Sequence, residues 1–335
     1  MTPDLFDCAE GIAFPVVSVV VPTYKRPDML QRCLTAIVNQ DLERCYEIIV
    51  CDDGPDGQTR LTVEAFIPDT FRAGCSIKYV PVTATQGPAG ARNCGWKAAR
   101  AEIIAFTDDD TIPDKAWLSE GLRALAKGAG AAAGRIRVPL CEQPTDYELD
   151  AAGLGEAEFA TANCFVRRNL LVRVGGFDER YTAAWREDSD LHFSLLEVGA
   201  TIVEARRAIV EHPVRPGRWG ISVSQQKKSQ FDALLYKKHR PIYKQRIPSP
   251  PWSYYAVAVC AVVVLFGALI ASLEVALAGL LGWIVLAVLF AIRRLRRTTH
   301  SPKHVAEMVA TSIVIPPLSV FWRLYGAYKF RVGFW

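Results

Sequence analysis

The chain has 335 residues, half of them hydrophobic, and a mean hydropathy of +0.13, which is high for a purely soluble protein of one or two domains. Its net charge of +4 is modest, but Lys and Arg concentrate at 206–246 and again at 293–297. Nine cysteines without a Cys-x-x-Cys pair argue against a zinc site and a disulfide framework, so we expect reduced thiols.

Residues 1–13 are predicted to form an N-terminal tail. Residues 1–10 are acidic and polar, and they lack the basic and apolar regions of a signal peptide. We therefore expect the domain that follows, over residues 14–245, to stay in the cytoplasm.

Strand and helix patterns alternate along this domain. The predicted strands are 16–22, 47–51, 77–82, 103–106, 131–138 and 163–166. Helical spacing from Leu30 to Val38, at about 89–101 and at 188–198 predicts helices, the last closed by Gly199. This alternation predicts an α/β fold with a mainly parallel sheet and with ligand-binding residues at the carboxyl ends of its strands.

The composition changes at Pro248–Pro251. Residues 253–272 and 275–292 are apolar almost throughout, and each is long enough to cross a bilayer as a helix. A buried core hairpin is the alternative, but a core helix is seldom apolar on every face. Basic residues flank both ends, so residues 246–300 predict a multi-pass transmembrane hairpin in the inner (cytoplasmic) membrane, with both ends in the cytoplasm.

Residues 301–335 predict an amphipathic tail. Apolar residues at 313–318 surround Pro316–Pro317, and aromatic and basic side chains follow, which is more typical of an interfacial segment than of a third span. The basic stretch 227–246 would suit nucleic acid or an ordinary solvated face. Because it adjoins a predicted span, we expect it to meet anionic membrane lipids and expect no nucleic-acid partner.

Two acidic clusters follow predicted strands. Asp108, Asp109 and Asp110 come directly after 103–106, and three adjacent carboxylates repel one another unless a cation neutralises them. Mg²⁺ or Mn²⁺ would suit these oxygens, and a solvated acidic turn is the alternative. Asp52 and Asp53, followed by Gly54, would accept hydrogen bonds from a base or ribose, or else form an Asx turn.

Six segments, in this order, resemble the motif series of family 2 glycosyltransferases with the GT-A fold: SVVVPTYKRPDML, EIIVCDDGPDGQT, GPAGARNCGW, AFTDDDTIPD, GGFDE and REDSDL. The resemblance covers residues 16–212. It implies a Rossmann-like GT-A catalytic domain that transfers a sugar from a nucleotide diphosphate sugar, with inversion, assisted by a divalent cation. With a membrane anchor, a lipid-linked or glycan acceptor is expected.

The resemblance also assigns roles to residues. Asp108 and Asp110 would form the D-x-D metal motif, although Asp109 leaves its register open by one residue. His212 would contact the metal or diphosphate, or be structural. The residues expected to bind the donor are Pro22, Thr23, Tyr24, Arg26, Asp52, Asp53, Arg92, Asp108 and Asp109.

The Glu187-Asp188 pair is the expected source of the catalytic base. Inverting transfer needs a carboxylate that takes the acceptor hydroxyl proton, and Asp188 is the candidate, with Glu187 beside it. An acidic first helical turn is the simpler explanation, and both can hold together. Two other functions remain: an inactive sugar-nucleotide-binding scaffold, and a nucleotidyltransferase, which the absence of glycine in the loop 23–27 disfavours.

Overall fold

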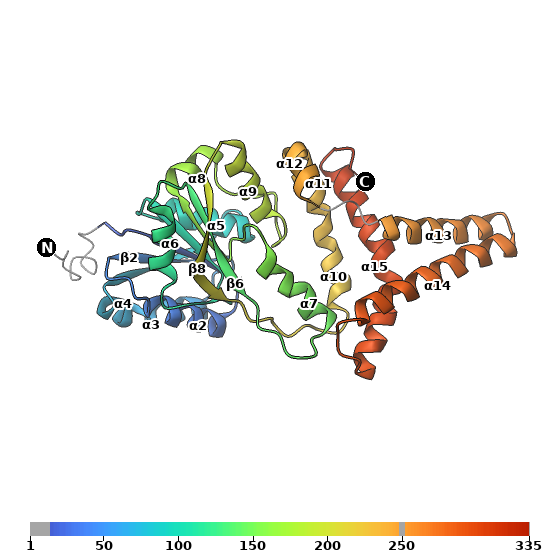
Figure 1. Ribbon diagram of the computed structural model, residues 1–335, viewed down its shortest axis with the longest axis horizontal. Coiled ribbons are helices and arrows are strands. Elements are labelled where there is room, and N and C mark those ends of the chain that lie inside the picture. Colours follow the sequence, from blue (N-terminus) through green and yellow to red (C-terminus); the bar gives the residue numbers. More distant parts are fainter. Residues whose placement is uncertain (1–13, 248–251, 335) are drawn as a thin grey trace. The chain divides into compact units, whose positions relative to one another are not determined.

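The computed structural model describes residues 14–247 and 252–334, so the tail predicted at 1–13 lies outside the described residues. The chain forms two compact units (Figure 1). Unit 1 comprises Met1–Pro139 and Leu154–Pro213, and unit 2 comprises Leu140–Gly153 and Val214–Trp335. Each is described by itself.

Unit 1 is built on an eight-stranded sheet of order β3-β2-β1-β4-β7-β6-β8-β5. Its strands are β1 (Ser18–Thr23), β2 (Tyr46–Asp52), β3 (Cys75–Pro81), β4 (Ile103–Thr107), β5 (Ile112–Pro113), β6 (Ala131–Arg137), β7 (Asn163–Arg167) and β8 (Ile202–Glu211). Strands β3, β2, β1 and β4 are parallel, as the βαβ pattern predicts. The second half is mixed, because β7 runs antiparallel to both β4 and β6, while β6 and β8 are parallel. The expectation of a mainly parallel sheet therefore holds only for the first half.

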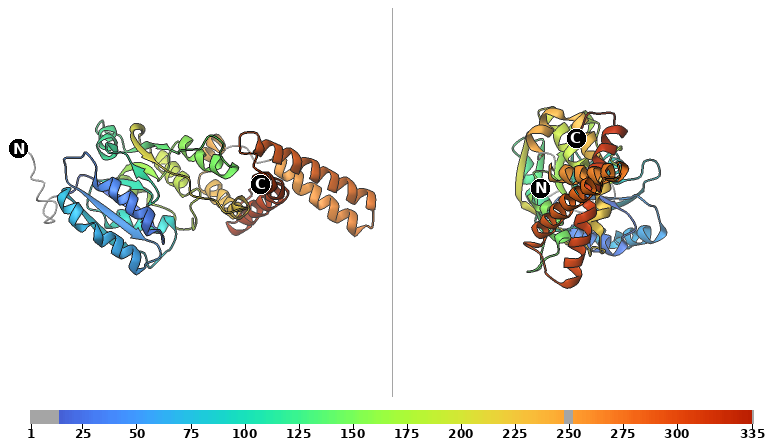
Figure 2. Two further views of the ribbon diagram at one scale, coloured as in Figure 1. Left: turned by 90° about the horizontal axis from the view of Figure 1, so that it is seen from below. Right: turned by 90° about the vertical axis from the view of Figure 1, so that its right-hand side faces the viewer.

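Helices cover both faces of this sheet (Figures 1 and 2). They are α2 (Pro27–Val38), α3 (Gly57–Ala65), α4 (Ile67–Arg72), α5 (Pro88–Ala98), α6 (Trp117–Leu125), α8 (Arg168–Val174) and α9 (Glu187–Glu197). Successive residues of a strand point to opposite faces, so Val19 and Val21 pack in one core with α2 and α6, and Val20 packs in the other with α5 and α9. Two buried layers hold the carboxyl ends of the strands in fixed register, and this is where the polar motifs lie.

Unit 2 is helical. It contains α7 (Asp146–Ala152), which a 3₁₀ turn η1 (Gly153–Glu156) follows, α10 (Ile221–Gln225), η2 (Gln226–Ser229), α11 (Gln230–Lys238), α12 (Arg240–Arg246), α13 (Trp252–Leu269), α14 (Leu273–Leu295) and α15 (Pro302–Lys329). Among the described residues, α13, α14 and α15 are long and apolar enough to cross a membrane. The two apolar segments predicted as helices are helical, and the tail is one continuous helix through Pro316 and Pro317.

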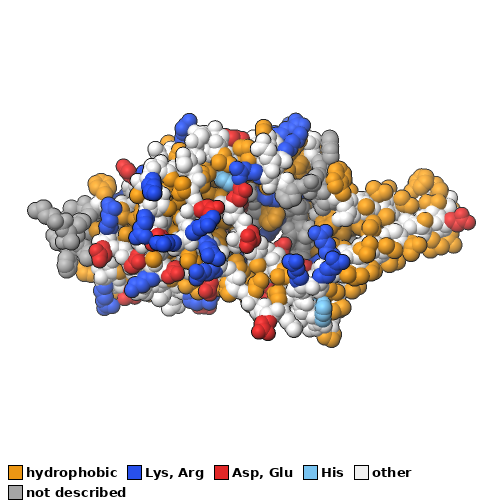
Figure 3. All heavy atoms as spheres, in the orientation of Figure 1, with side chains coloured by type: hydrophobic (Ala, Val, Ile, Leu, Met, Phe, Trp, Pro, Cys, Tyr) orange, Lys and Arg blue, Asp and Glu red, His pale blue; other side chains and the backbone are white. Residues whose placement is uncertain are grey.

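Helices α13 and α14 pack tightly against each other. A Cβ added at Gly279 would lie 2.9 Å from the Val264 nitrogen, and one at Gly267 would collide with the Ala276 backbone. Small residues that let two helix backbones approach this closely are typical of helix pairs in lipid, where apolar burial gives no driving force. The visible surface of the pair is almost entirely hydrophobic, with an acidic side chain at its tip (Figure 3).

Candidate active site

The three aspartates after β4 have three different environments. Asp109 is fully buried, accepts a hydrogen bond from Thr23 Oγ1 at 2.7 Å, and lies 2.9 Å from Arg26 Nη2. Burial raises its pKa to about 7, although Arg26 pulls it down. Asp110 also reaches this guanidinium, with its Oδ2 3.3 Å from Arg26 Nη1. Asp109 therefore ties the end of β4 to the loop after β1, and its two neighbours are left to face the site.

Asp108, Asp110 and His212 come together at the end of the sheet. One ligand atom of each lies within 4.8 Å of the others, and His212 Nε2 is 3.4 Å from Asp110 Oδ1. His212 follows β8, and its backbone N–H donates to the Arg137 carbonyl at 2.8 Å, which fixes its place. Two carboxylates fit the oxygen ligands that Mg²⁺ or Mn²⁺ prefers, and the imidazole adds a third ligand atom. Sequence reasoning selected all three residues.

Arg92 of α5 links this group to the predicted catalytic pair. Its guanidinium is buried, with Nη2 2.7 Å from Asp108 Oδ1 and Nη1 3.3 Å from Glu187 Oε1. Burial would lower the pKa of Arg92, but Asp108 and Glu187 raise it, so the group stays charged. Burial would likewise raise the pKa of Asp108, yet Arg92 and His212 outweigh it and lower that pKa. One cation thus holds two carboxylates from distant parts of the chain.

Glu187 and Asp188 begin helix α9. The turn before them places Arg186 in the left-handed region, at a φ of 73°. Glu187 is buried against Arg92, and burial together with the Asp188 charge raises its pKa to about 7. Asp188 is more exposed, its Oδ1 accepts from the Ser189 N–H at 2.6 Å, and burial raises its pKa. Of the two carboxylates, Asp188 is the more accessible.

The aspartates after β2 differ as well. Asp52 is fully buried and accepts hydrogen bonds from Gly54 N–H, Asp56 N–H and the Tyr79 hydroxyl, so it shapes the loop. Asp53 is partly exposed, and both of its oxygens accept from the Gly87 N–H, at 2.8 and 2.9 Å. Burial raises the pKa of Asp53, although the hydrogen bond from Gly87 acts in the opposite direction. The sequence analysis predicted no role for Tyr79 or Gly87. Only their positions, near the end of a strand and just before a helix, could have indicated that they lie at the site.

The loop after β1 supplies an exposed aromatic surface. Pro22 is buried in the strand, whereas Tyr24 is half exposed and its ring lies against Gly54. A Cβ at Gly54 would lie 2.6 Å from that ring, so the contact requires glycine. Arg26 reaches back to Asp109 and Asp110. The four residues predicted here therefore lie at the end of β1 and in the loop after it, with Thr23 and Arg26 held by the acidic triplet.

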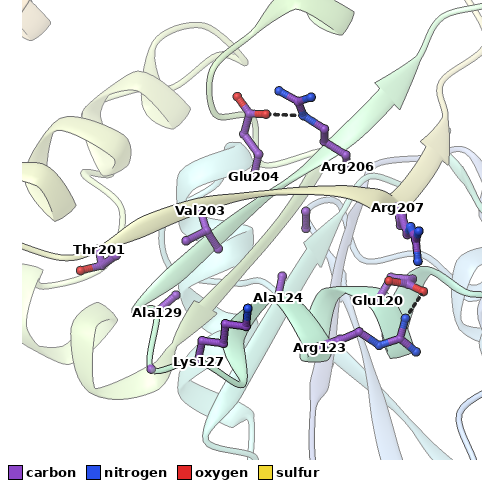
Figure 4. A pocket seen from close by; sticks show the side chains of 12 residues that line it. Glu120, Arg123, Ala124, Lys127, Ala129, Thr201, Val203, Glu204, Arg206 and Arg207 are labelled. Atoms are coloured by element: carbon purple, nitrogen blue, oxygen red, sulfur yellow. Dashed lines mark hydrogen bonds and ion pairs between the residues drawn. The ribbon is translucent and has the colours of Figure 1, made fainter.

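A separate groove of about 550 Å³ lies between α6 and β8, away from these residues (Figure 4). Its charged side chains pair locally, Arg123 with Glu120 and Arg206 with Glu204. No predicted site residue lines it. We therefore assign the chemistry to the strand ends and not to this groove.

Comparison with known proteins shows which sequences and structures this chain resembles. Residues 18–179 match the family described as Glycosyl transferase family 2. Glycosyltransferase AglE of Haloferax volcanii is 25% identical over 215 residues, 60% of this chain and 68% of its own length. The GalNAc(5)-diNAcBac-PP-undecaprenol beta-1,3-glucosyltransferase of Campylobacter jejuni is 38% identical over 97 residues, 29% of this chain and 30% of its own. The chain spans less than half the length of several other relatives.

A solved structure shares the fold. The mannosyltransferase PcManGT from Pyrobaculum calidifontis, in complex with GDP-Man and Mn²⁺, superposes with a TM-score of 0.57 over 93% of this chain and 88% of its own, at 21% identity. Residues 18–179 are thus similar to the family 2 glycosyltransferases, and the chain shares the fold of a known mannosyltransferase.

Proposed function

We propose that this glycosyltransferase moves a sugar from a nucleoside diphosphate to a membrane-associated acceptor, with inversion at the anomeric carbon. One observation carries the proposal: Arg92 connects the Asp108–Asp110–His212 group directly to Glu187, the neighbour of Asp188. The site for the leaving diphosphate and the site for the acceptor hydroxyl would then adjoin across one guanidinium.

In this proposal Asp188 is the general base. The acceptor hydroxyl oxygen attacks the anomeric carbon, the bond from that carbon to the diphosphate oxygen breaks, and the hydroxyl proton passes to the Asp188 carboxylate. Anchoring of Oδ1 by Ser189 fixes the direction of that carboxylate. Glu187, buried against Arg92, positions the start of α9 and is not the group that receives the proton.

Asp110 and His212, with Asp108, would hold the divalent cation, Mg²⁺ or Mn²⁺. A bound cation supplies positive charge to the leaving diphosphate. Arg26, about one-third exposed, adds a fixed positive charge beside Asp110. Tyr24 and Asp53 would take the nucleoside, the ring by stacking and the carboxylate by accepting a hydrogen bond from the base or ribose.

For the membrane part, we propose that α13 and α14 form a transmembrane hairpin with both ends in the cytoplasm. Basic residues cluster at the end of α14, at Arg293, Arg294, Arg296 and Arg297, whereas Glu274 lies at the turn. The donor site would then face the cytoplasm. The Campylobacter relative is named for an undecaprenol-linked glycan, which supports a lipid-linked acceptor here.

The test uses the full chain purified in detergent. We expect Mn²⁺ with one class of UDP-, GDP- or dTDP-sugar to raise the melting temperature, and the same radiolabelled sugar to enter the lipid extract of membranes that hold the protein. Asp69→Asn, an exposed carboxylate in α4, is the matched control and should behave as the parent. Absence of both stabilisation and transfer across the panel would contradict the proposal.

A further inference from the structure

Helix α15 buries polar as well as apolar side chains, and its exposed face is mostly apolar. The side chains it buries include His304, Thr311, Ser312, Ser319 and Arg323. Its exposed face is apolar or aromatic over more than five turns, through Val309, Ile313, Val314, Phe321, Leu324, Tyr325 and Tyr328. A helix at a water-exposed surface shows the reverse arrangement. The outer face of α15 is therefore suited to an apolar environment.

The inner face of α15 is fastened to polar helices along its length. Near its start, Glu307 Oε1 accepts from the Gly220 N–H at 2.6 Å. Near its end, Arg323 lies 3.3 Å from Asp232 of α11, and Lys329 donates to Gln230 Oε1 at 3.0 Å. The approach is close enough that a Cβ at Gly326 would collide with the Gln230 carbonyl.

These attachments decide how α15 meets a membrane. A 28-residue helix, at about 1.5 Å per residue, is long enough to span a bilayer. If α15 did so, it would draw α11, with Asp232, Lys237 and Lys238, into the hydrocarbon. Each such charge costs about 2.5–3.5 kcal/mol at the bilayer centre.

The middle of α15 is tied to the base of the helix pair. Arg294 Nη1, in the last turn of α14, donates to Thr311 Oγ1 at 2.7 Å. Pro317 lacks the N–H that would pair with the Ile313 carbonyl, and the Trp283 indole N–H donates to that carbonyl at 3.3 Å instead. In Figures 1 and 2, α15 runs across the base of α13 and α14 rather than beside them.

We propose that α15 lies in the plane of the membrane interface, with its outer face in the lipid and its inner face carrying α10 and α11. The inference rests on the transmembrane hairpin of the proposed function, because a helix that crosses the base of a spanning pair is parallel to the bilayer. Basic residues at the two ends of α15, Arg297, Lys303, Lys329 and Arg331, match anionic headgroups.

Three single cysteines test the topology in the full chain, reconstituted into vesicles of phosphatidylethanolamine and phosphatidylglycerol. They replace Lys303 and Gly333, exposed at the two ends of α15, and Glu274 at the hairpin turn. The background has Cys8, Cys141 and Cys260 replaced with Ser, and labelling of that parent is subtracted. The probe is a membrane-impermeant maleimide, added before or after detergent.

Each arrangement gives a different pattern. The in-plane helix predicts that Lys303→Cys and Gly333→Cys label from the same side and Glu274→Cys from the other. If α15 spanned the membrane, Gly333→Cys would label from the same side as Glu274→Cys. That result would overturn the inference and leave the hairpin intact. Labelling of Glu274→Cys from the same side as Lys303→Cys would overturn the hairpin itself, and the inference with it.

Spin labels give a second, independent readout of depth. Labels at Val309, Ile313, Phe321 and Leu324 should all sit about 5–10 Å below the headgroup boundary, as in an interfacial helix. Leu265, exposed in the middle of α13, should be deeper and serves as the control. A spanning helix would instead separate the first and last of the four labels by about 22 Å in depth, at about 1.5 Å per residue. That gradient would overturn the inference.

Discussion

Replacing Asp188 with Asn should remove the general base and leave the donor site in place. Its Oδ1 is held by Ser189, and Asn keeps that acceptor, so the start of α9 should not move. We expect turnover to fall by roughly 10²–10⁴-fold, the usual contribution of a positioned base, or about 2.7–5.5 kcal/mol of activation free energy. Donor affinity should stay within about twofold, because Arg92, which pairs with Asp108 of the metal group, is joined to Glu187 and not to Asp188.

The acidic limb of the pH profile tests the same assignment. Burial raises the pKa of Asp188, and the base works only when ionised, so the parent rate should fall as the pH drops through this raised value. The Asp188→Asn variant should lose that limb. The assay is the initial rate on the true acceptor across pH, beside donor affinity by calorimetry.

Glu187→Gln is the matched control. Gln still accepts the hydrogen bond from Arg92 Nη1, and it resembles the protonated carboxyl that a pKa of about 7 makes common near neutrality. We expect turnover to fall by less than about tenfold. At a pH below about 7, where Glu187 itself carries a proton, we expect no loss of turnover. If Asp188→Asn loses donor affinity and turnover equally, its role is structural. If Glu187→Gln is dead and Asp188→Asn active, Glu187 is the base.

Three further changes follow from other contacts. Asp110→Asn should abolish transfer and weaken Mn²⁺-dependent donor binding measured by calorimetry, and near-normal turnover in chelator-treated buffer would show that no metal is held there. Arg294→Met should destabilise the detergent-purified protein by about 1–3 kcal/mol, because it breaks the partly buried 2.6 Å pair with Asp146, whereas exposed Arg206→Met should cost under about 1 kcal/mol in the same thermal melts. Gly279→Leu should lower the melting temperature and folded yield, because its side chain meets the α13 backbone, and an unchanged melt would refute the close packing.

The first half of the sheet is predictable because its signals are local. The run before Pro22 is buried on both faces as β1, and the apolar spacing from Leu30 to Val38 is the buried face of α2. The order of the second half has no such signal. Strand β7 enters antiparallel between β4 and β6, with Cys164 opposite both Phe106 and Ala133, and this register depends on partners far along the chain.

Of β8, the sequence pattern predicts only the strand-like stretch Ala208–Val210, because polar residues occupy much of the strand. The strand extends from Ile202 to Glu211, and Glu204, Arg206 and Arg207 on it face solvent. A strand with one solvent-exposed face has the sequence pattern of a polar loop unless its polar and apolar residues alternate regularly. The bulge where β6 shifts register, between Gly134 and Arg135, breaks that regularity opposite β8.

Membrane helices show the same limit in another form. Mean hydropathy is taken over all faces of a helix, so α15 qualifies as a candidate span together with α13 and α14. Its difference from them lies in which face is buried: α15 hides Thr311, Ser312 and Arg323, whereas α13 and α14 bury few residues of any kind. Only the packing against α10 and α11 reveals that direction.

At the site, the sequence identifies the residues but not the way they share charge. Strand ends and a helix start are enough to select Asp108 and Glu187, yet the cation between them comes from α5, 16 residues before Asp108 and 95 before Glu187. Because Arg92 lowers the pKa of Asp108 and also pairs with Glu187, it favours an ionised Asp108 while it holds the turn that presents Asp188. In the proposed reaction, a divalent cation that drew Asp108 away from Arg92 would leave Glu187 as its remaining partner. Occupation of the donor site would then tighten the contact that positions the base.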